Sequence, residues 1–304
     1  MLGTFLGAVS VVGCSTNTIN EGRNLSASGI AYTESVNALL DETIKQVIDF
    51  DSQELLITRI GSNPRRMLKE KNKVLSELIK EIDLFRYQMS LMQSYFVNLQ
   101  SVSDSVVSEQ TGESIGSISS AISRLNDLSK NNKHSGYDYT DIDEEQHRYI
   151  GTLAGMLMQA NYAANIKATL KRDAPIIGTQ LLLQEKQLDN ILGILKARIA
   201  IGNKIYLNEN VMAPYIDMDN PVDQEMWVEN RRHWFRLQQV TPIFEKVQEA
   251  QKALRVSWED ILRGKKDAGA VSTMLIDIDE FVSTLHALEK AKAAKRIEQA
   301  GQID

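Results

Sequence analysis

The sequence has little of several residue types, and each shortage narrows the classes of protein to which it can belong. Its 304 residues include one cysteine, which excludes an intramolecular disulfide and any metal site built from several cysteines. The net charge is −6 at pH 7, so the chain lacks the basic surface with which a dedicated nucleic-acid-binding protein contacts phosphates. We therefore expect no nucleic-acid partner.

Helix-breaking and aromatic residues are also scarce, with five prolines and 6% aromatic residues. Alanine, leucine, glutamate, glutamine and lysine are abundant instead, which is the composition of long helices. With 43% hydrophobic residues, the chain is long enough for one large core or two ordinary domains. No alternating strand pattern extends beyond a few residues. Composition and pattern together predict an all-α protein.

The clearest periodic pattern is a heptad repeat between residues 75 and 99. Its apolar positions alternate in spacing between three and four residues: Leu75, Leu78, Ile82, Phe85, Met89, Met92, Phe96 and Leu99. This spacing indicates a helix with one apolar seam, and a helix over 65–103 would measure about 58 Å. Because globular helices average about 11–12 residues, we predict an elongated antiparallel helical bundle with long, coiled-coil-like helices.

Proline and glycine divide the chain into further helices. We expect a first helix over about 31–60, followed by the stretch GSNP, in which Asn63 caps the next helix and Pro64 begins it. A helix over about 140–171 should be followed by a new one that starts at the sequence DAP of residues 173–175.

The C-terminal third should contain a loop bracketed by Pro214 and Pro221, a helix that opens after Pro221, and a kink or restart at Pro242. A last helix should bury one apolar face: Met274, Ile278, Phe281, Leu285 and Leu288. We expect residues 31–304 to form a single helical-bundle domain.

The only cysteine lies at the junction between an apolar and a polar segment. Residues 1–13 carry no charge, and the chain turns polar from Cys14 onward. The apolar run is too short to span a bilayer, which needs about 20 helical residues, and it is typical of a secretory signal. The sequence VVGC at residues 11–14 resembles the lipobox of bacterial lipoproteins.

This resemblance implies a signal peptide over 1–13, cleavage before Cys14, and acylation of the Cys14 thiol and of its new amine. Acyl chains of this kind would anchor the protein stably to a membrane. Residues 14–30 would then be a lipidated cysteine and a flexible tether. Because Ser15 and not aspartate follows the cysteine, the resemblance favours the outer membrane, with the body facing the periplasm. The alternative is a buried N-terminal element with an unreactive cysteine.

The best metal-ligand candidate is the pair Glu144 and His147, a Glu-x-x-His motif of the kind found in bundle di-iron proteins. Such a site needs a second motif of this kind, and His134, His233 and His286 have no glutamate three residues before them. An acidic first helical turn that complements the helix dipole explains the same residues. We predict no metal and no cofactor.

The stretch MWVENRRHWFRL, residues 226–237, combines tryptophan with arginine. Trp227 and Trp234 are seven residues apart and share one helix face, and we expect them to be core anchors. The alternative is an interaction hot spot, in which tryptophan and arginine predominate. Its candidate residues are Trp227, Arg231, Arg232, Trp234 and Arg236.

A hairpin over 149–201 supports a second functional hypothesis. Residues 149–166 are uncharged and include a small-xxx-small pair, Gly151 and Gly155, of the type that lets helices approach closely in lipid. Insertion of this hairpin into a membrane would make the protein a pore-forming-like, membrane-active protein. Two closely packed bundle helices explain the same residues.

No phosphate-binding loop, nucleophile elbow or defensible catalytic triad is present in the sequence. We therefore predict a non-catalytic, membrane-anchored lipoprotein that acts as a periplasmic helical scaffold or adaptor for protein partners. Its partners would be the membrane, through the lipid, and other proteins, and self-association into a homo-oligomer is left open. The membrane-active hairpin is the alternative function, and an oxidative di-metal enzyme built on Glu144 and His147 is a third.

Overall fold

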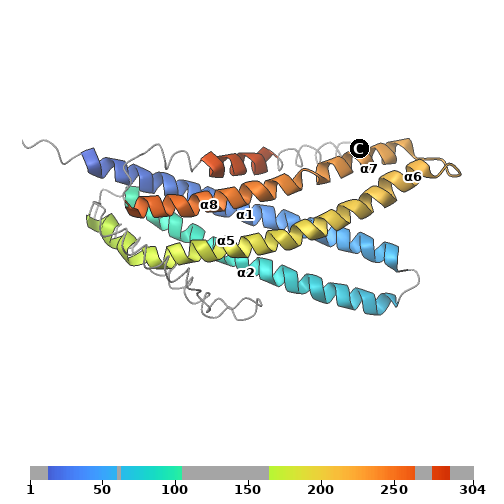
Figure 1. Cartoon of the computed structure of the whole chain (residues 1–304), viewed down its shortest axis with the longest axis horizontal. Coiled ribbons are helices and arrows are strands. Elements are labelled where there is room, and N and C mark those ends of the chain that lie inside the picture. Colours follow the sequence, from blue (N-terminus) through green and yellow to red (C-terminus); the bar gives the residue numbers. More distant parts are fainter. Residues whose placement is uncertain (1–12, 60–62, 105–163, 264–275, 288–304) are drawn as a thin grey trace, which may run out of the picture. The chain divides into compact units, whose positions relative to one another are not determined.

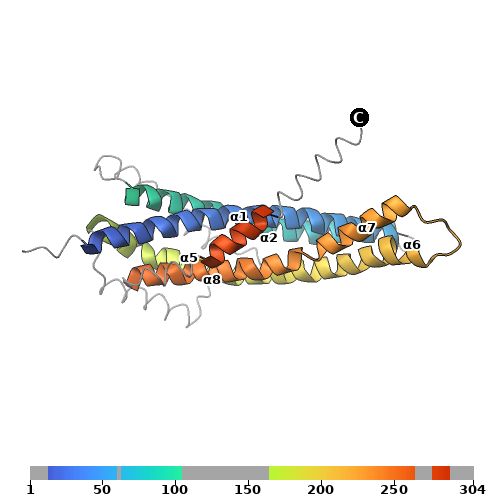
Figure 2. The ribbon, with the colours of Figure 1, turned by 90° about the horizontal axis from the view of Figure 1, so that it is seen from above.

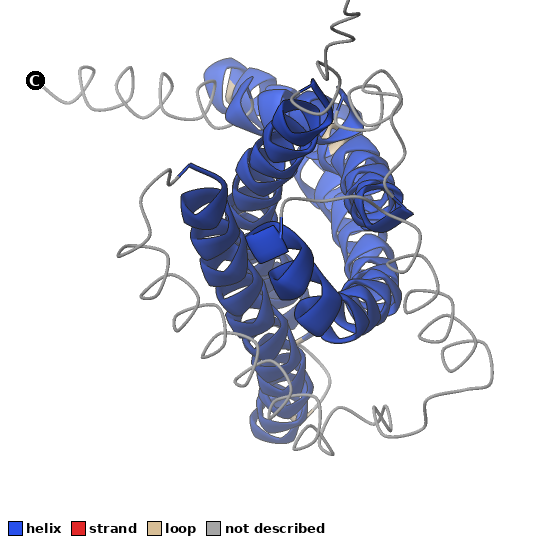
Figure 3. Cartoon of the chain, turned by 90° about the vertical axis from the view of Figure 1, so that its left-hand side faces the viewer, coloured by secondary structure: helices blue, strands red, loops and turns tan. Residues whose placement is uncertain are grey.

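The computed structural model describes residues 13–59, 63–104, 164–263 and 276–287, and all regular structure in these ranges is helical (Figures 1 and 3). The helices are α1 (Gly13–Thr58), α2 (Pro64–Asp104), α5 (Ala164–Tyr206), a short π-helix η1 (Leu207–Met212), α6 (Ala213–Ile216), α7 (Gln224–Leu237) and α8 (Val240–Arg263). A further helix covers residues 276–287. The predicted all-α helical bundle is confirmed.

The chain divides into two compact units, whereas the sequence led us to expect a single domain. Unit 1 comprises Met1–Tyr32, Ser90–Leu183 and Gln251–Asp279, and unit 2 comprises Thr33–Met89, Gln184–Ala250 and Glu280–Asp304. The boundary falls inside α1, α2, α5, α8 and the helix over 276–287, so each of these helices supplies one stretch to each unit.

Unit 1 has an aromatic core. The Tyr95 ring packs edge-on against Trp258 at a centroid distance of 6.1 Å, and both side chains are fully buried. On α1, Gly29 faces Phe96 of α2 so closely that a Cβ at position 29 would lie 2.6 Å from the Phe96 ring. Gln251 of α8 donates a hydrogen bond to the Leu181 carbonyl oxygen of α5 at 3.0 Å, which ties these two helices together.

Unit 2 combines apolar packing with ion pairs between helices. Gly202 of α5 lies against the buried ring of Phe50 of α1. The Lys71 ammonium of α2 contacts the Glu54 carboxylate of α1 at 2.7 Å. Gln248 of α8 donates to the Asp189 carboxylate of α5 at 2.6 Å. These contacts tie together the stretches of α1, α2, α5 and α8 that belong to this unit.

The heptad prediction for α2 is confirmed. The helix begins at Pro64, and the Asn63 side chain accepts a hydrogen bond from the Arg66 backbone N–H at 3.2 Å, as expected of a capping residue. Leu75 at the start of the seam is half-buried, and the remaining seam positions are buried, each at most 7% exposed: Leu78, Ile82, Phe85, Met89, Met92, Phe96 and Leu99.

The start of α1 corrects the prediction for residues 14–30. The helix begins at Gly13, not near residue 31, so the segment expected to be a flexible tether is helical. Leu25 and Ser26 are fully buried, and Gly29 packs on Phe96. The polar composition of this segment concealed the helix, because its burial depends on small residues that let a neighbouring helix approach, not on an apolar stripe.

The expected helix start at residues 173–175 is also wrong, because α5 runs without interruption from Ala164 to Tyr206. Proline inside a helix removes one backbone hydrogen bond and costs about 3 kcal/mol. The flanking residues Asp173, Ala174 and Ile177 are buried, so tertiary packing on both sides of Pro175 offsets this cost. The helix expected over 140–171 lies outside the described residues up to 163.

The expected boundary of the C-terminal loop at Pro214 is wrong, because Pro214 lies in the short helix α6 (Ala213–Ile216), while the other C-terminal predictions hold. Residues 217–223 form the loop, and α7 follows with Asp223 as its N-cap, whose carboxylate accepts from the Met226 N–H at 3.0 Å. A new helix, α8, starts at Val240, next to Pro242. In the helix over 276–287 the predicted face is buried at Ile278, Phe281 and Leu285, while residues 274 and 288 lie outside the described ranges.

Candidate functional site

The candidate site is on α7, which folds back along the end of α5 in unit 2 (Figures 1 and 2). Pro214 has no N–H, so it cannot donate to a carbonyl of the preceding turn. The Asn230 amide of α7 reaches the Asn210 carbonyl oxygen, four residues before Pro214, at 3.5 Å. The Trp227 indole N–H donates to the neighbouring Val211 carbonyl oxygen at 2.9 Å. This bonding fixes α7 against η1, which follows α5 directly.

A tyrosine adds a second attachment. The Tyr206 hydroxyl donates to the Asn230 side-chain oxygen at 3.0 Å, and its ring lies 5.0 Å from the His233 ring. Burial raises the pKa of Tyr206, and the nearby Glu229 carboxylate raises it further. Glu229 in turn accepts from the Arg236 guanidinium at 2.7 Å. One face of α7 is thus committed to holding the helix in place.

Another face of α7 presents an alternating stack of aromatic and guanidinium groups. The Arg231 guanidinium lies 5.8 Å from the centroid of the Trp227 ring and 5.5 Å from that of Phe235. These residues are four apart along the helix, which places them one above the other. The Tyr215 ring of α6 extends the stack by lying on Trp227 at 5.6 Å. We call Trp227, Arg231 and Phe235 the aromatic–arginine face.

This face is open to solvent. The Phe235 side chain is 52% exposed, Arg231 and Arg232 are exposed, and Trp227, Trp234 and Arg236 are half-buried. The expectation that both tryptophans are core anchors is therefore wrong. The Trp227 indole N–H holds α7 on η1 through its hydrogen bond to Val211. The Trp227 ring stacks between the exposed side chains of Tyr215 and Arg231.

Sequence reasoning missed Phe235 and the exposed apolar residues beside α7. A usable signal was present, because Phe235 is four residues after Arg231 and so shares its face. The neighbouring residues are between 42% and 93% exposed: Met212, Tyr215, Ile216, Met218, Val222 and Met226. Apolar residues gathered in this way mark interaction surfaces more often than residues exposed singly.

The other sequence candidates are not brought into this site. Cys14 lies in the first turn of α1, in unit 1. Glu144 and His147 lie outside the described residues, and within those residues no group of three His, Cys, Asp or Glu side chains could hold a metal ion.

The hairpin proposed for membrane insertion is described in part. Residues 149–163 lie outside the described ranges, and 164–201 belong to α5, where Ile177, Leu181 and Leu195 are buried. Within the described ranges, no helix combines the length and the hydrophobicity needed to span a bilayer.

Comparison of the chain with protein families, with curated proteins and with solved structures gave no match.

Proposed function

We propose that the chain is a lipid-anchored, non-catalytic helical scaffold of the bacterial cell envelope that binds protein partners through the aromatic–arginine face of α7. The observation that carries the binding role is the exposure of Phe235 at 52%, stacked on an arginine that also contacts a tryptophan. Tryptophan, tyrosine and arginine supply most of the binding energy at protein interfaces.

The preorganisation of this face supports the proposal. Stacking on two rings restricts the Arg231 side chain, so less conformational entropy is lost when a partner binds. The indole hydrogen bond to Val211 of η1 and the hydroxyl hydrogen bond from Tyr206 of α5 keep α7 itself from moving. An exposed cation–π contact contributes only about 0.5–1 kcal/mol, which is too little to explain why a folded monomer would leave Phe235 in water.

The anchor rests on the lipobox-like sequence VVGC and on Ser15, which favours the outer membrane with the body in the periplasm. Since α1 begins at Gly13, a helix would start at the acylated residue itself. The buried Leu25 is eleven positions after Cys14, which corresponds to about 16 Å along a helix at 1.5 Å per residue. The anchor would therefore hold the body close to the membrane surface, without a flexible spacer.

Intact-mass measurement of the protein purified from bacterial membranes tests the anchor. The mature chain should lack residues 1–13 and carry acyl mass on Cys14, and Cys14→Ser should abolish that mass. A mature chain that keeps Met1 and a free thiol would refute the anchor while leaving the binding role of α7 untouched.

Affinity capture from detergent-solubilised envelopes tests the binding role. The double variant Arg231→Ala/Phe235→Ala removes the centre of the aromatic–arginine face. It leaves Trp227, Tyr206 and Asn230, whose hydrogen bonds hold α7 in place, unchanged. The amount of partner that this variant captures should be at least about tenfold lower than for the wild type, because truncating hot-spot residues typically costs 2 kcal/mol or more. The control is Glu249→Ala/Lys252→Ala, two exposed residues of α8, which should capture as the wild type does. If Arg231→Ala/Phe235→Ala captured as much partner as the control variant, this role of α7 would be refuted.

A further inference from the structure

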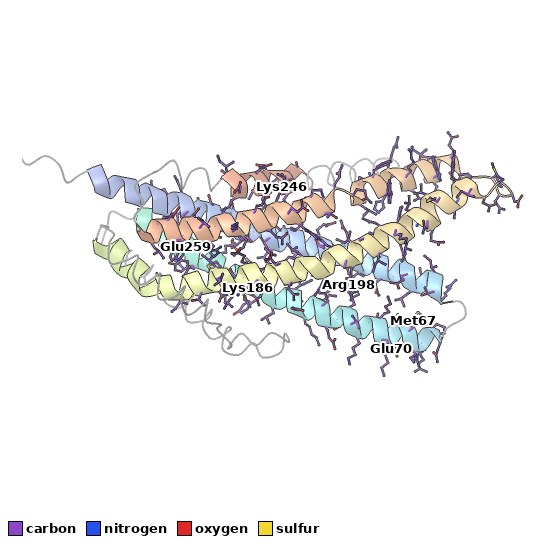
Figure 4. The ribbon with its side chains drawn as sticks, in the orientation of Figure 1. Met67, Glu70, Lys186, Arg198, Lys246 and Glu259 are labelled. Carbon is purple, nitrogen blue, oxygen red and sulfur yellow. The ribbon has the colours of Figure 1, made fainter. Side chains whose placement is uncertain are left out.

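Unit 2 contains an apolar groove between the end of α1 and the start of α2. Its volume is about 430 Å³, and its lining is mostly apolar, with Asp51 and Arg59 as the charged members. The apolar side chains include Ile48, Leu55, Leu56, Met67, Leu68 and Leu75. Leu56 is 61% exposed and Leu68 is 48% exposed. Met67, labelled in Figure 4, lies in the first turn of α2. The volume is within the range of sites that hold side chains or small ligands, about 300–1,000 Å³.

The groove has a basic rim. Residues 59–73 include six basic residues against one acidic residue, Glu70. Lys71 is occupied by Glu54 at 2.7 Å, but Arg59, Arg65 and Lys69 are exposed and make no ion pair among the described residues. We define the basic rim by these unpaired residues together with their exposed neighbours: Arg59, Arg65, Arg66, Lys69 and Lys73.

The segment between α5 and α7 carries negative charge, whereas the rim of the groove carries positive charge. Residues 205–230 contain no lysine or arginine. Five acidic side chains in this stretch are exposed and make no ion pair among the described residues: Glu209, Asp217, Asp219, Asp223 and Glu225. Between them lie exposed apolar side chains, with Met218 at 93%, Tyr215 at 69% and Ile216 at 64%. We call residues 209–226 the acidic tip.

The end of α1 and the start of α2, which line the groove, lie at the same end of unit 2 as α6 and the loop that follows it (Figures 1 and 2). We propose that two copies of this chain associate end to end, with the acidic tip of each copy seated in the basic-rimmed groove of the other. Two such contacts are related by a twofold axis, so the arrangement closes as a dimer and leaves no free tip.

The charge and apolar character of the groove match those of the acidic tip, which favours a second copy of the chain as the occupant of the groove. The groove needs an apolar segment with negative charge, and the acidic tip is such a segment on the same chain. A membrane with anionic lipids would attract the basic rim but repel the acidic tip at the same end. A loop that folded back into its own groove would satisfy the same chemistry, so the test must distinguish contacts within one chain from contacts between chains. This inference does not rest on the role proposed for α7 or on the anchor.

Charge reversal on each side of the contact provides the test. The tip variant is Asp219→Lys/Glu225→Lys, which spares Asp217 and Asp223 because their carboxylates accept hydrogen bonds within the tip. The rim variant is Arg65→Glu/Lys69→Glu. The control is Lys80→Glu/Glu249→Lys, two exposed residues outside both surfaces. The full chain, purified in a mild detergent, is measured by analytical ultracentrifugation over a concentration series.

The wild type and the control should form dimers with the same association constant. Each reversal variant alone opposes like charges at both contacts and should lower that constant by at least about tenfold. A mixture of the tip and rim variants should form heterodimers at the wild-type level, because both of their contacts pair opposite charges again. The chain that carries both reversals should recover the homodimer. Contact within one chain cannot produce the heterodimer.

A photo-cross-linking residue at position 218, the most exposed apolar position of the tip, identifies what the tip touches. In a mixture of isotopically light and heavy copies, it should link to residues 48–75 of the other copy. Sedimentation as a monomer throughout the series would overturn the proposal. So would a dimer unaffected by either reversal, or a cross-link formed only within one chain, to lipid or to a different protein.

Discussion

At the residue scale, two glycines of α5 have opposite surroundings. A Cβ at Gly202 would collide with the buried Phe50 ring of α1, while a Cβ at Gly193 would meet nothing within 4 Å. Both are in a helix, where glycine costs about 0.5–1 kcal/mol relative to alanine. The glycine at 202 is therefore required by close approach of two helices, and the one at 193 is not.

We expect Gly202→Ala to lower the free energy of unfolding by about 1–3 kcal/mol, because the Phe50 ring has to shift. The matched change Gly193→Ala should raise it by about 0.5–1 kcal/mol, since it gains helix propensity without a clash. Urea unfolding followed by circular dichroism measures both. A destabilising effect at position 193 as large as that at position 202 would contradict the close packing of Gly202 on Phe50 and the open surroundings of Gly193.

Tyr206 supplies a pH-dependent contact. Burial and Glu229 raise its pKa above the ordinary value near 10, so the folded state favours the neutral phenol. Its stabilising contribution is complete below pH 10 and is lost as the pH rises through the folded-state pKa.

Tyr206→Phe removes the hydrogen bond to Asn230 and should cost about 0.5–1.5 kcal/mol at pH 8. Above pH 10 the difference between the wild type and this variant should narrow, because only the wild type loses the phenol contact. Denaturant unfolding at pH 8 and at pH 11 gives the two differences. A gap that widens with pH would mean that the fold stabilises the phenolate.

At the scale of elements, the long helices differ in how their burial is encoded. In α2 an apolar seam at heptad spacing is buried almost completely, so the periodicity and the packing agree. The first part of α1 has no such seam, and its contact with α2 depends on Gly29. A Cβ-free position permits close helix packing without adding hydrophobicity, and hydropathy patterns therefore do not detect it.

The seam of α2 can be tested by one charge. Ile82 is fully buried, so Ile82→Asp would bury an unpaired carboxylate at a cost of several kcal/mol. Val74, on the same helix, is 50% exposed, and Val74→Asp should change stability by no more than about 0.5 kcal/mol. Thermal unfolding by circular dichroism should show a greatly weakened transition for Ile82→Asp alone. Wild-type melting of that variant would mean that the seam is not a core.

At the scale of the whole molecule, the continuity of the long helices α1, α2, α5 and α8 through the boundary between the units has a thermodynamic consequence. When one unit unfolds, each of α1, α2, α5 and α8 loses part of its length. Each remaining helical stretch would then end at the boundary, where its last backbone N–H or C=O groups would have no intrahelical hydrogen-bond partner. We infer that the two units unfold together.

The three tryptophans allow this to be measured, because Trp258 belongs to unit 1 and the other two belong to unit 2. In the variant Trp227→Phe/Trp234→Phe, fluorescence reports only on the surroundings of Trp258. Its urea midpoint should coincide with the midpoint from circular dichroism, as two-state unfolding requires. Separate midpoints would show that unit 1 unfolds on its own.

The sequence by itself determined the all-α class, the bounds of α2 and its buried seam, the cap at Asn63 and the restart near Pro242. These are local properties: helix propensity, heptad spacing, capping and the missing proline N–H act within one turn or along one face. The sequence also singled out the Trp–Arg stretch of α7, but it could not establish that the tryptophans would be half-exposed.

Only the tertiary structure decided the features that depend on a neighbouring helix. The helix at residues 13–30 and the continuous path through Pro175 both oppose local preference, and packing of Gly29 on Phe96 and of the residues around Pro175 outweighs it. The exposure of Phe235 and the groove between α1 and α2 are likewise properties of several elements together. A one-dimensional pattern specifies which face of a helix is apolar, but not whether another helix is present to cover it.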